Sequence, residues 1–128
     1  MIKIEPKEKL LWIDGIAGSV VGIGALVLFN WLYALYQLPR HILLAIVLAN
    51  ILYGCYALFV ASRKKRPMGL IIGLAAANLM WMFVSIGLLF AYGHQASVFG
   101  WLHIAGEGTF VAVLSFFEWH WRHELTTT

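Results

Sequence analysis

Residues 41–67 read HILLAIVLANILYGCYALFVASRKKRP, and they are the strongest indication of how the chain folds. The first 22 residues of this stretch contain no Asp, Glu, Lys or Arg, and the basic run from Arg63 to Arg66 follows at once. A helix needs about 20 apolar residues to cross the hydrocarbon core of a bilayer. The stretch therefore predicts a transmembrane helix that ends in a basic cluster at one membrane surface.

Three further apolar stretches of similar length lie on either side of residues 41–62. They cover about residues 10–36, 68–92 and 98–121, and Pro39, Pro67 and the polar segment 93–97 separate the spans. The chain is 62% hydrophobic and 12% charged, whereas soluble domains carry about 25% charged residues. We therefore expect an all-α integral membrane protein, in which residues 1–128 form a single bundle of four transmembrane helices.

The basic residues are distributed unequally between the two ends of these spans. Arg40 alone falls on one side, and the other eight Lys and Arg residues fall on the opposite side: Lys3, Lys7, Lys9, Arg63, Lys64, Lys65, Arg66 and Arg122. Lys and Arg near span ends are retained in the cytoplasm. We therefore expect a multi-pass protein of the cell (inner) membrane, surrounded by membrane lipids, with both termini cytoplasmic.

The composition also disfavours several classes of function. The net charge of +3 comes from residues that flank the spans, where they set topology, so we expect no nucleic-acid partner. Cys55 is the single cysteine, which excludes a disulfide within the chain and a two-cysteine redox site. The sequence lacks HExxH, Gly-x-Ser-x-Gly and phosphate-loop motifs. These features favour a protein that is not an enzyme and predict no metal and no cofactor.

Glu107 is an acidic residue expected near the bilayer midplane. Counting inward from Val98 at 1.5 Å per residue places it about 14 Å deep. An ionised carboxylate at that depth costs at least about 2.5 kcal/mol, so such residues face the bundle interior and are commonly functional. We therefore expect Glu107 to line the inside of the bundle.

Three other polar residues are expected near the level of Glu107. The same count places Asn50 about 12 Å and Asn78 about 15 Å into their spans. His103 precedes Glu107 by four residues, which puts both on one helical face. Glu118 returns to nearly that face further along the helix. Glu107, His103, Asn50 and Asn78 thus form the predicted binding site for a ligand or a proton.

Three kinds of function are compatible with these residues. The leading hypothesis is a small binding or transport protein whose bundle, alone or as a homodimer, takes up a proton-coupled or cationic, partly hydrophobic small molecule. The first alternative is a non-catalytic membrane assembly or adaptor subunit, whose polar groups hold helices together. The second is a membrane-embedded lipid or isoprenoid enzyme with His103 and Glu107 as an acid-base pair. For a metal, that pair supplies two ligands where a zinc site uses at least three.

Small residues predict where the helices touch. Gly18 and Gly22 in the first span, and Gly69 and Gly73 in the third, are spaced four residues apart. That spacing lets two helix backbones approach closely in lipid. We interpret these glycines as packing seams.

Asp14 lies near the inner end of the first span, at the depth of Arg122. Acids near span ends reach water at little cost, so the simplest role for Asp14 is an interfacial ion pair with Arg122. Such a pair would hold the first helix against the last.

Overall fold

The computed structural model describes residues 8–126, and Lys3 and Lys7 of the expected basic lead-in lie outside them. Within this part of the chain all regular structure is helical apart from an isolated bridge residue between α3 and α4. Six helices follow one another: α1 (Lys9–Val27), α2 (Phe29–Tyr36), α3 (Arg40–Ser62), α4 (Met68–Tyr92), α5 (Val98–His120) and α6 (Arg122–Leu125).

Four of these helices, α1, α3, α4 and α5, are long and apolar enough to cross a membrane. Their outward faces carry large apolar side chains such as Val20, Leu52, Met80 and Phe90, each more than 60% exposed. A soluble bundle would place polar residues there. The expectation of an all-α chain with four membrane-spanning helices is confirmed, and its bounds agree with the predicted spans except in the first.

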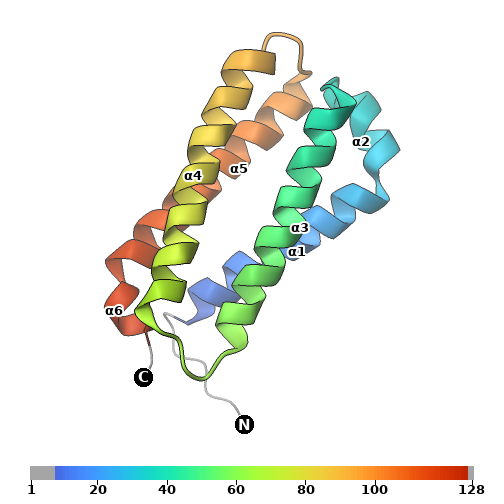
Figure 1. The fold of residues 1–128 in the computed structure, drawn as a ribbon. Helices are drawn as coiled ribbons and strands as arrows, with labels where there is room; N and C mark the ends of the chain where they lie inside the picture. The colour runs from blue at the N-terminus through green and yellow to red at the C-terminus, as the bar shows by residue number, and fades with distance from the viewer. Residues whose placement is uncertain (1–7, 127–128) are drawn as a thin grey trace.

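The four long helices form two closely packed pairs. α1 packs along α3, and α4 packs along α5, whereas the two pairs contact each other much less. Figure 1 shows α4 and α5 running side by side, with α3 beside α1 and α2. The space between the pairs holds the polar side chains described below.

The contact between α1 and α3 is a seam of glycines. A Cβ atom on Gly18 would lie 3.1 Å from the Cα of Gly54, and a Cβ on Gly54 would collide with the backbone nitrogen of Ser19. Gly22 fits equally closely against α3. The seam expected on α1 is therefore present, and its partner glycine is Gly54. On α4 the two predicted glycines differ: a Cβ on Gly73 would lie 2.8 Å from the Tyr56 hydroxyl of α3, whereas Gly69 has no neighbour within 4 Å of such a Cβ.

The predicted first span is two helices instead of one. The backbone leaves helical geometry at Leu28, with φ −96° and ψ 19°, and α2 continues in a different direction (Figure 1). α2 ends at Gln37, whose φ of 56° is left-handed. The turn before α5 then binds the end of α2, because the backbone N–H of Ser97 donates to the carbonyl of Tyr36 at 2.9 Å. The bend thus brings Tyr36 from the α1–α3 pair to the start of α5.

The opposite end of the bundle is held by Arg66. Its guanidinium donates to the carbonyl of Leu125 at 3.0 Å, to the carbonyl of Arg63 at 2.9 Å and to Oε1 of Glu8 at 2.6 Å. The residue is 4% exposed, so these bonds are shielded from water. Arg66 therefore joins the beginning and the end of the described chain to the segment between α3 and α4.

Candidate functional site

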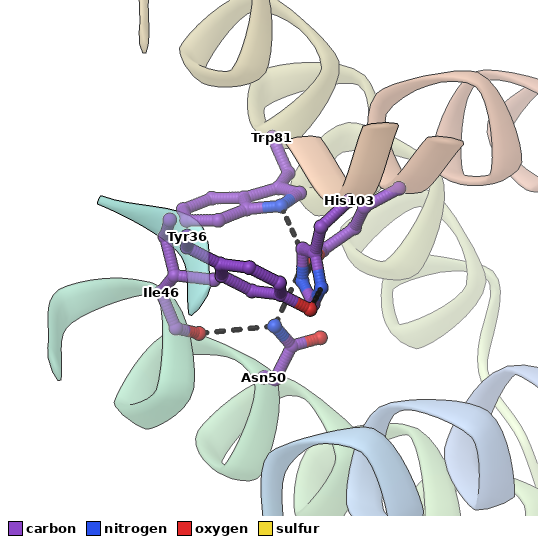
Figure 2. A network of polar contacts seen from close by, with 6 residues as sticks. Tyr36, Ile46, Asn50, Trp81 and His103 are labelled. Atoms are coloured by element: carbon purple, nitrogen blue, oxygen red, sulfur yellow. Dashed lines mark hydrogen bonds and ion pairs between the residues drawn. The ribbon is translucent and has the colours of Figure 1, made fainter. Parts of the chain in front are cut away.

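Glu107, in the middle of α5, is the centre of a hydrogen-bond network that joins both helix pairs. Figure 2 shows Asn50, Trp81 and His103 converging on one point between the helices. Its Oε1 accepts from Nδ2 of Asn50 on α3 at 2.9 Å and from Nε1 of Trp81 on α4 at 2.7 Å. Its Oε2 lies 2.8 Å from Nε2 of His103, one turn earlier on α5. Three nitrogen donors thus surround one carboxylate, and charge-assisted bonds of this kind are about twice as strong as neutral ones.

His103 is fixed between Glu107 and Tyr36. Nε2 of His103 lies 2.8 Å from Oε2 of Glu107, one helical turn further along α5. Nδ1 lies 2.9 Å from the Tyr36 hydroxyl at the end of α2. Both ring nitrogens are therefore engaged, and the imidazole is held between a phenol and a carboxyl group.

Two cavities flank the bond between Asn50 and Glu107. One, of about 330 Å³, lies between α1, α3 and α5, and its walls include Asp14, Tyr53, His103 and Phe110. The other, of about 300 Å³, lies between α3, α4 and α5, and its walls include Tyr53, Asn78, Trp81 and Val84. Asn50 and Glu107 line both cavities. Their volumes match the lower end of the about 300 to 1,000 Å³ usual for small-molecule sites.

An acidic side chain lines each cavity, and no permanently positive side chain among residues 8–126 does. The Glu107 side chain is 13% exposed and therefore reachable from the cavities. The first cavity contains a second carboxylate, that of Asp14. Among residues 8–126, no Lys or Arg lines either cavity, and His103 is the one basic group that does. The remaining lining is mostly apolar or aromatic, which suits a ligand with a positive charge and apolar substituents.

A second polar network lies closer to the end of the bundle held by Arg66. The hydroxyl of Tyr53 on α3 donates to Oδ2 of Asp14 on α1 at 2.6 Å. Nδ2 of Asn78 on α4 lies 3.1 Å from the same Asp14 oxygen, 2.7 Å from the Tyr53 hydroxyl and 2.7 Å from Oε1 of Glu118 on α5. Four helices thus each contribute one polar side chain to this cluster.

The structure separates the four residues of the predicted site into two groups. Glu107, His103 and Asn50 belong to one network, as the spacing and depth indicated. Asn78 bonds to Glu118 instead, although it lines a cavity together with Glu107. The depth of Asn78 was counted along a straight span, and this count does not specify the neighbouring helix toward which its side chain points.

The expected ion pair between Asp14 and Arg122 is wrong. Asp14 is 2% exposed and bonds to Tyr53 and Asn78 inside the bundle. The guanidinium of Arg122 lies over the ring of Trp119, with 4.1 Å from its Cζ to the ring centroid, and donates to the Trp119 carbonyl. α1 faces α3 and the cavity at this level, so its carboxylate turns inward and away from the membrane surface.

Sequence reasoning placed neither Tyr36 nor Trp81 among the groups bonded to Glu107 and His103. Trp81 follows Asn78 by three residues on α4. A buried indole N–H needs a hydrogen-bond acceptor, and this requirement could have suggested a contact with Glu107. Tyr36 gave no comparable signal, because it reaches His103 only through the bend at Leu28. Both contacts depend on the packing of helices that are distant in the sequence.

Comparison with known proteins adds no further constraint on the function. The chain matches no protein-family model, no curated protein and no solved structure. Its function therefore has to be inferred from the geometry of the two networks and the cavities between them.

Proposed function

We propose that this chain is a small membrane protein that binds, and passes across the bilayer, a small cation with apolar substituents. The proposal is carried by one observation. A mid-membrane carboxylate, Glu107, lines two largely apolar cavities whose walls contain no Lys or Arg among the described residues. A cation beside Glu107 would supply the missing positive charge, and the apolar walls would accept its substituents.

The aromatic residues near Glu107 favour a cation over a neutral apolar ligand. Tyr53 and Phe110 line the first cavity, and Trp81 lines the second. An aromatic face attracts a nearby cation by about 0.5 to 2 kcal/mol, and more strongly where water is excluded. The carboxylate of Glu107 and the aromatic rings would therefore both attract the bound cation.

A pair of organic ions that share one shape and differ in the sign of their charge tests this proposal. Tetraphenylphosphonium and tetraphenylborate would each be added to the purified protein in detergent, and binding measured by equilibrium dialysis. We expect binding of the phosphonium and not of the borate. Glu107→Gln should weaken phosphonium binding at least tenfold, which corresponds to about 1.4 kcal/mol. The control is Glu124→Gln, which removes an exposed carboxylate on α6, distant from both cavities.

Equal binding of the two ions, or unchanged phosphonium binding by a folded Glu107→Gln variant, would overturn the proposal. In that case the second candidate, a membrane assembly or adaptor subunit, becomes the better account. The observation that favours it is that Glu107 is bonded to side chains from both helix pairs, so the network also works as a connection between helices. Replacement of Glu107 in such a subunit should lower its stability, and no ligand binding should be affected.

We also propose that both ends of the chain are cytoplasmic and that the bundle lies in the cell (inner) membrane. Of the seven Lys and Arg residues in the described part of the chain, Arg40 lies at one end of the bundle and the other six at the opposite end. Arg66 bonds to Glu8 and Leu125, which brings the ends of the described chain to that basic end. The positive end of a small bundle stays in the cytoplasm.

A further inference from the structure

The cluster formed by Asp14 and Glu118 is not explained by cation binding at Glu107. Both carboxylates are buried, with Asp14 2% and Glu118 0% exposed. Asp14 Oδ2 lies 3.1 Å and Glu118 Oε1 lies 2.7 Å from the same nitrogen of Asn78. The two oxygens are therefore at most about 5.8 Å apart, which is the sum of these distances. Two carboxylates that share a buried site this small cannot both be ionised without strong repulsion.

One oxygen of this cluster has no hydrogen-bond donor. Oε2 of Glu118 is fully buried and unpartnered among the described residues, although Oε1 of the same carboxylate accepts from Asn78. An ionised oxygen left without a donor in a dry interior is expensive. The cost falls when Glu118 is protonated, because the acid is then neutral and has a hydrogen to donate to the neighbouring carboxyl group of Asp14.

The groups around the pair offer no other neutralising charge. α1 supplies Asp14, α3 supplies the phenols of Tyr53 and Tyr56, and α4 supplies the neutral amide of Asn78. Within residues 8–126, neither carboxylate has a Lys or Arg partner. Asn78 also directs its N–H group toward both carboxylates, which would repel a metal ion. A proton is the occupant that these neighbours allow.

The pair is also placed to respond to a ligand beside Glu107. Asp14 and Tyr53 line the same cavity as Glu107 and His103, whereas Glu118 lies behind them and lines neither cavity. A cation in that cavity would lower the energy of a negative charge on Asp14. Binding of the cation therefore favours loss of the proton from the pair.

We propose that Asp14 and Glu118 together hold one proton at neutral pH and release it to water when a cation binds in the cavity beside Glu107. The proton leaves as the cation enters, so the net charge of the buried region stays constant. The exchange rests on the proposed function, whereas the presence of the proton in the empty protein does not. The protein would accordingly exchange a cation for a proton.

Infrared spectroscopy tests the presence of the proton in the protein without ligand. At neutral pH a protonated acid gives a carbonyl stretch that ionised carboxylates lack, and the band shifts in heavy water. We expect this band in the unmodified protein and in Glu107→Gln, and its loss in Glu118→Gln, because the remaining Asp14 keeps the donors Tyr53 and Asn78. Asp14→Asn should keep the band at a shifted frequency, because the buried acid of Glu118 loses its neighbouring carboxylate. A spectrum of the unmodified protein with no acid band, or a band that only Glu107→Gln removes, would overturn the shared proton.

The exchange is tested by adding tetraphenylphosphonium to weakly buffered protein that contains a pH indicator. We expect about one proton released per cation bound, and an affinity that rises at least about fivefold with pH, within the range usual for coupled sites. Glu118→Gln should release no proton from the pair, and its affinity should rise less with pH than that of the unmodified protein. Binding without proton release in the unmodified protein would overturn the exchange and leave the proposed function standing. Absence of phosphonium binding would overturn the proposed function and the exchange, while the infrared result still decides the shared proton.

Discussion

Nδ2 of Asn50 donates to Oε1 of Glu107 at 2.9 Å across the space between the two helix pairs, and a cavity lies on each side of this bond. The same Nδ2 also donates to the carbonyl of Ile46 on its own helix at 3.0 Å, which fixes the amide (Figure 2). Asn50 thus connects the pairs where they otherwise touch little. The bond both positions the carboxylate and holds the bundle together.

Replacing Asn50 with Ala should lower the stability of the bundle by about 0.6 to 1.7 kcal/mol, the range of side-chain hydrogen bonds between membrane helices. The reason is loss of the bond to Glu107, which leaves that oxygen with Trp81 as its remaining donor. Unfolding in detergent by a denaturant titration measures the effect. Asn30→Ala, on an exposed position of α2, is the control. Equal losses in the two variants would show that the bond contributes nothing to stability.

Gly54→Ala should destabilise the protein strongly, because the added Cβ would collide with the backbone of Ser19 and force α1 away from α3. Backbone atoms cannot move aside as a flexible side chain can. The matched control is Gly87→Ala on α4, where nothing lies within 4 Å of the new Cβ. We expect a lowered melting temperature for the first variant and none for the second. Similar melting temperatures of Gly54→Ala and Gly87→Ala would show that α1 and α3 do not pack closely at Gly54.

Arg66→Met should destabilise the end of the bundle at which α3 leads into α4. The change leaves the carbonyl of Leu125 without this donor and Glu8 without this positive partner, at a cost of about 1 to 3 kcal/mol for an unsatisfied buried group. Limited trypsin digestion, which cuts after Lys64 and Lys65, should become faster. The control is Lys65→Met, at an exposed position, which removes a positive charge but keeps the bonds of Arg66. Trypsin should cut this variant after Lys64 as slowly as it cuts the unmodified protein. Unaltered digestion in Arg66→Met would argue against the role of Arg66.

The orientation proposed for the bundle predicts which cysteines an impermeant reagent reaches in intact cells. In a Cys55→Ala background, Gln95→Cys should react from outside and Ser62→Cys should not. Both positions are exposed, and they lie at opposite ends of the bundle. After the membrane is opened, both should react. Labelling of Ser62→Cys in sealed cells would reverse the orientation.

The contact between His103 and Glu107, and the common depth of Glu107 and Asn50, were the parts of the candidate site that the sequence could predict. His103 and Glu107 are four residues apart on α5, and their side chains meet at 2.8 Å for that reason alone. The four apolar runs likewise predicted which helices are long and apolar enough to cross a membrane, because that length has to match the bilayer. Both are properties of neighbouring residues, and no information about distant helices is needed to read them.

The partners of Asn78 and Tyr36 were decided by the tertiary structure. Counting residues gives the depth of a side chain along its own helix, at 1.5 Å per residue. It gives neither the tilt of that helix nor the direction in which the side chain points. Asn78 therefore meets Glu118 and Asp14 because α4 packs against α5 beside α1, and Tyr36 meets His103 because the chain bends at Leu28. Depth is fixed by the local sequence, whereas direction depends on how the two helix pairs pack.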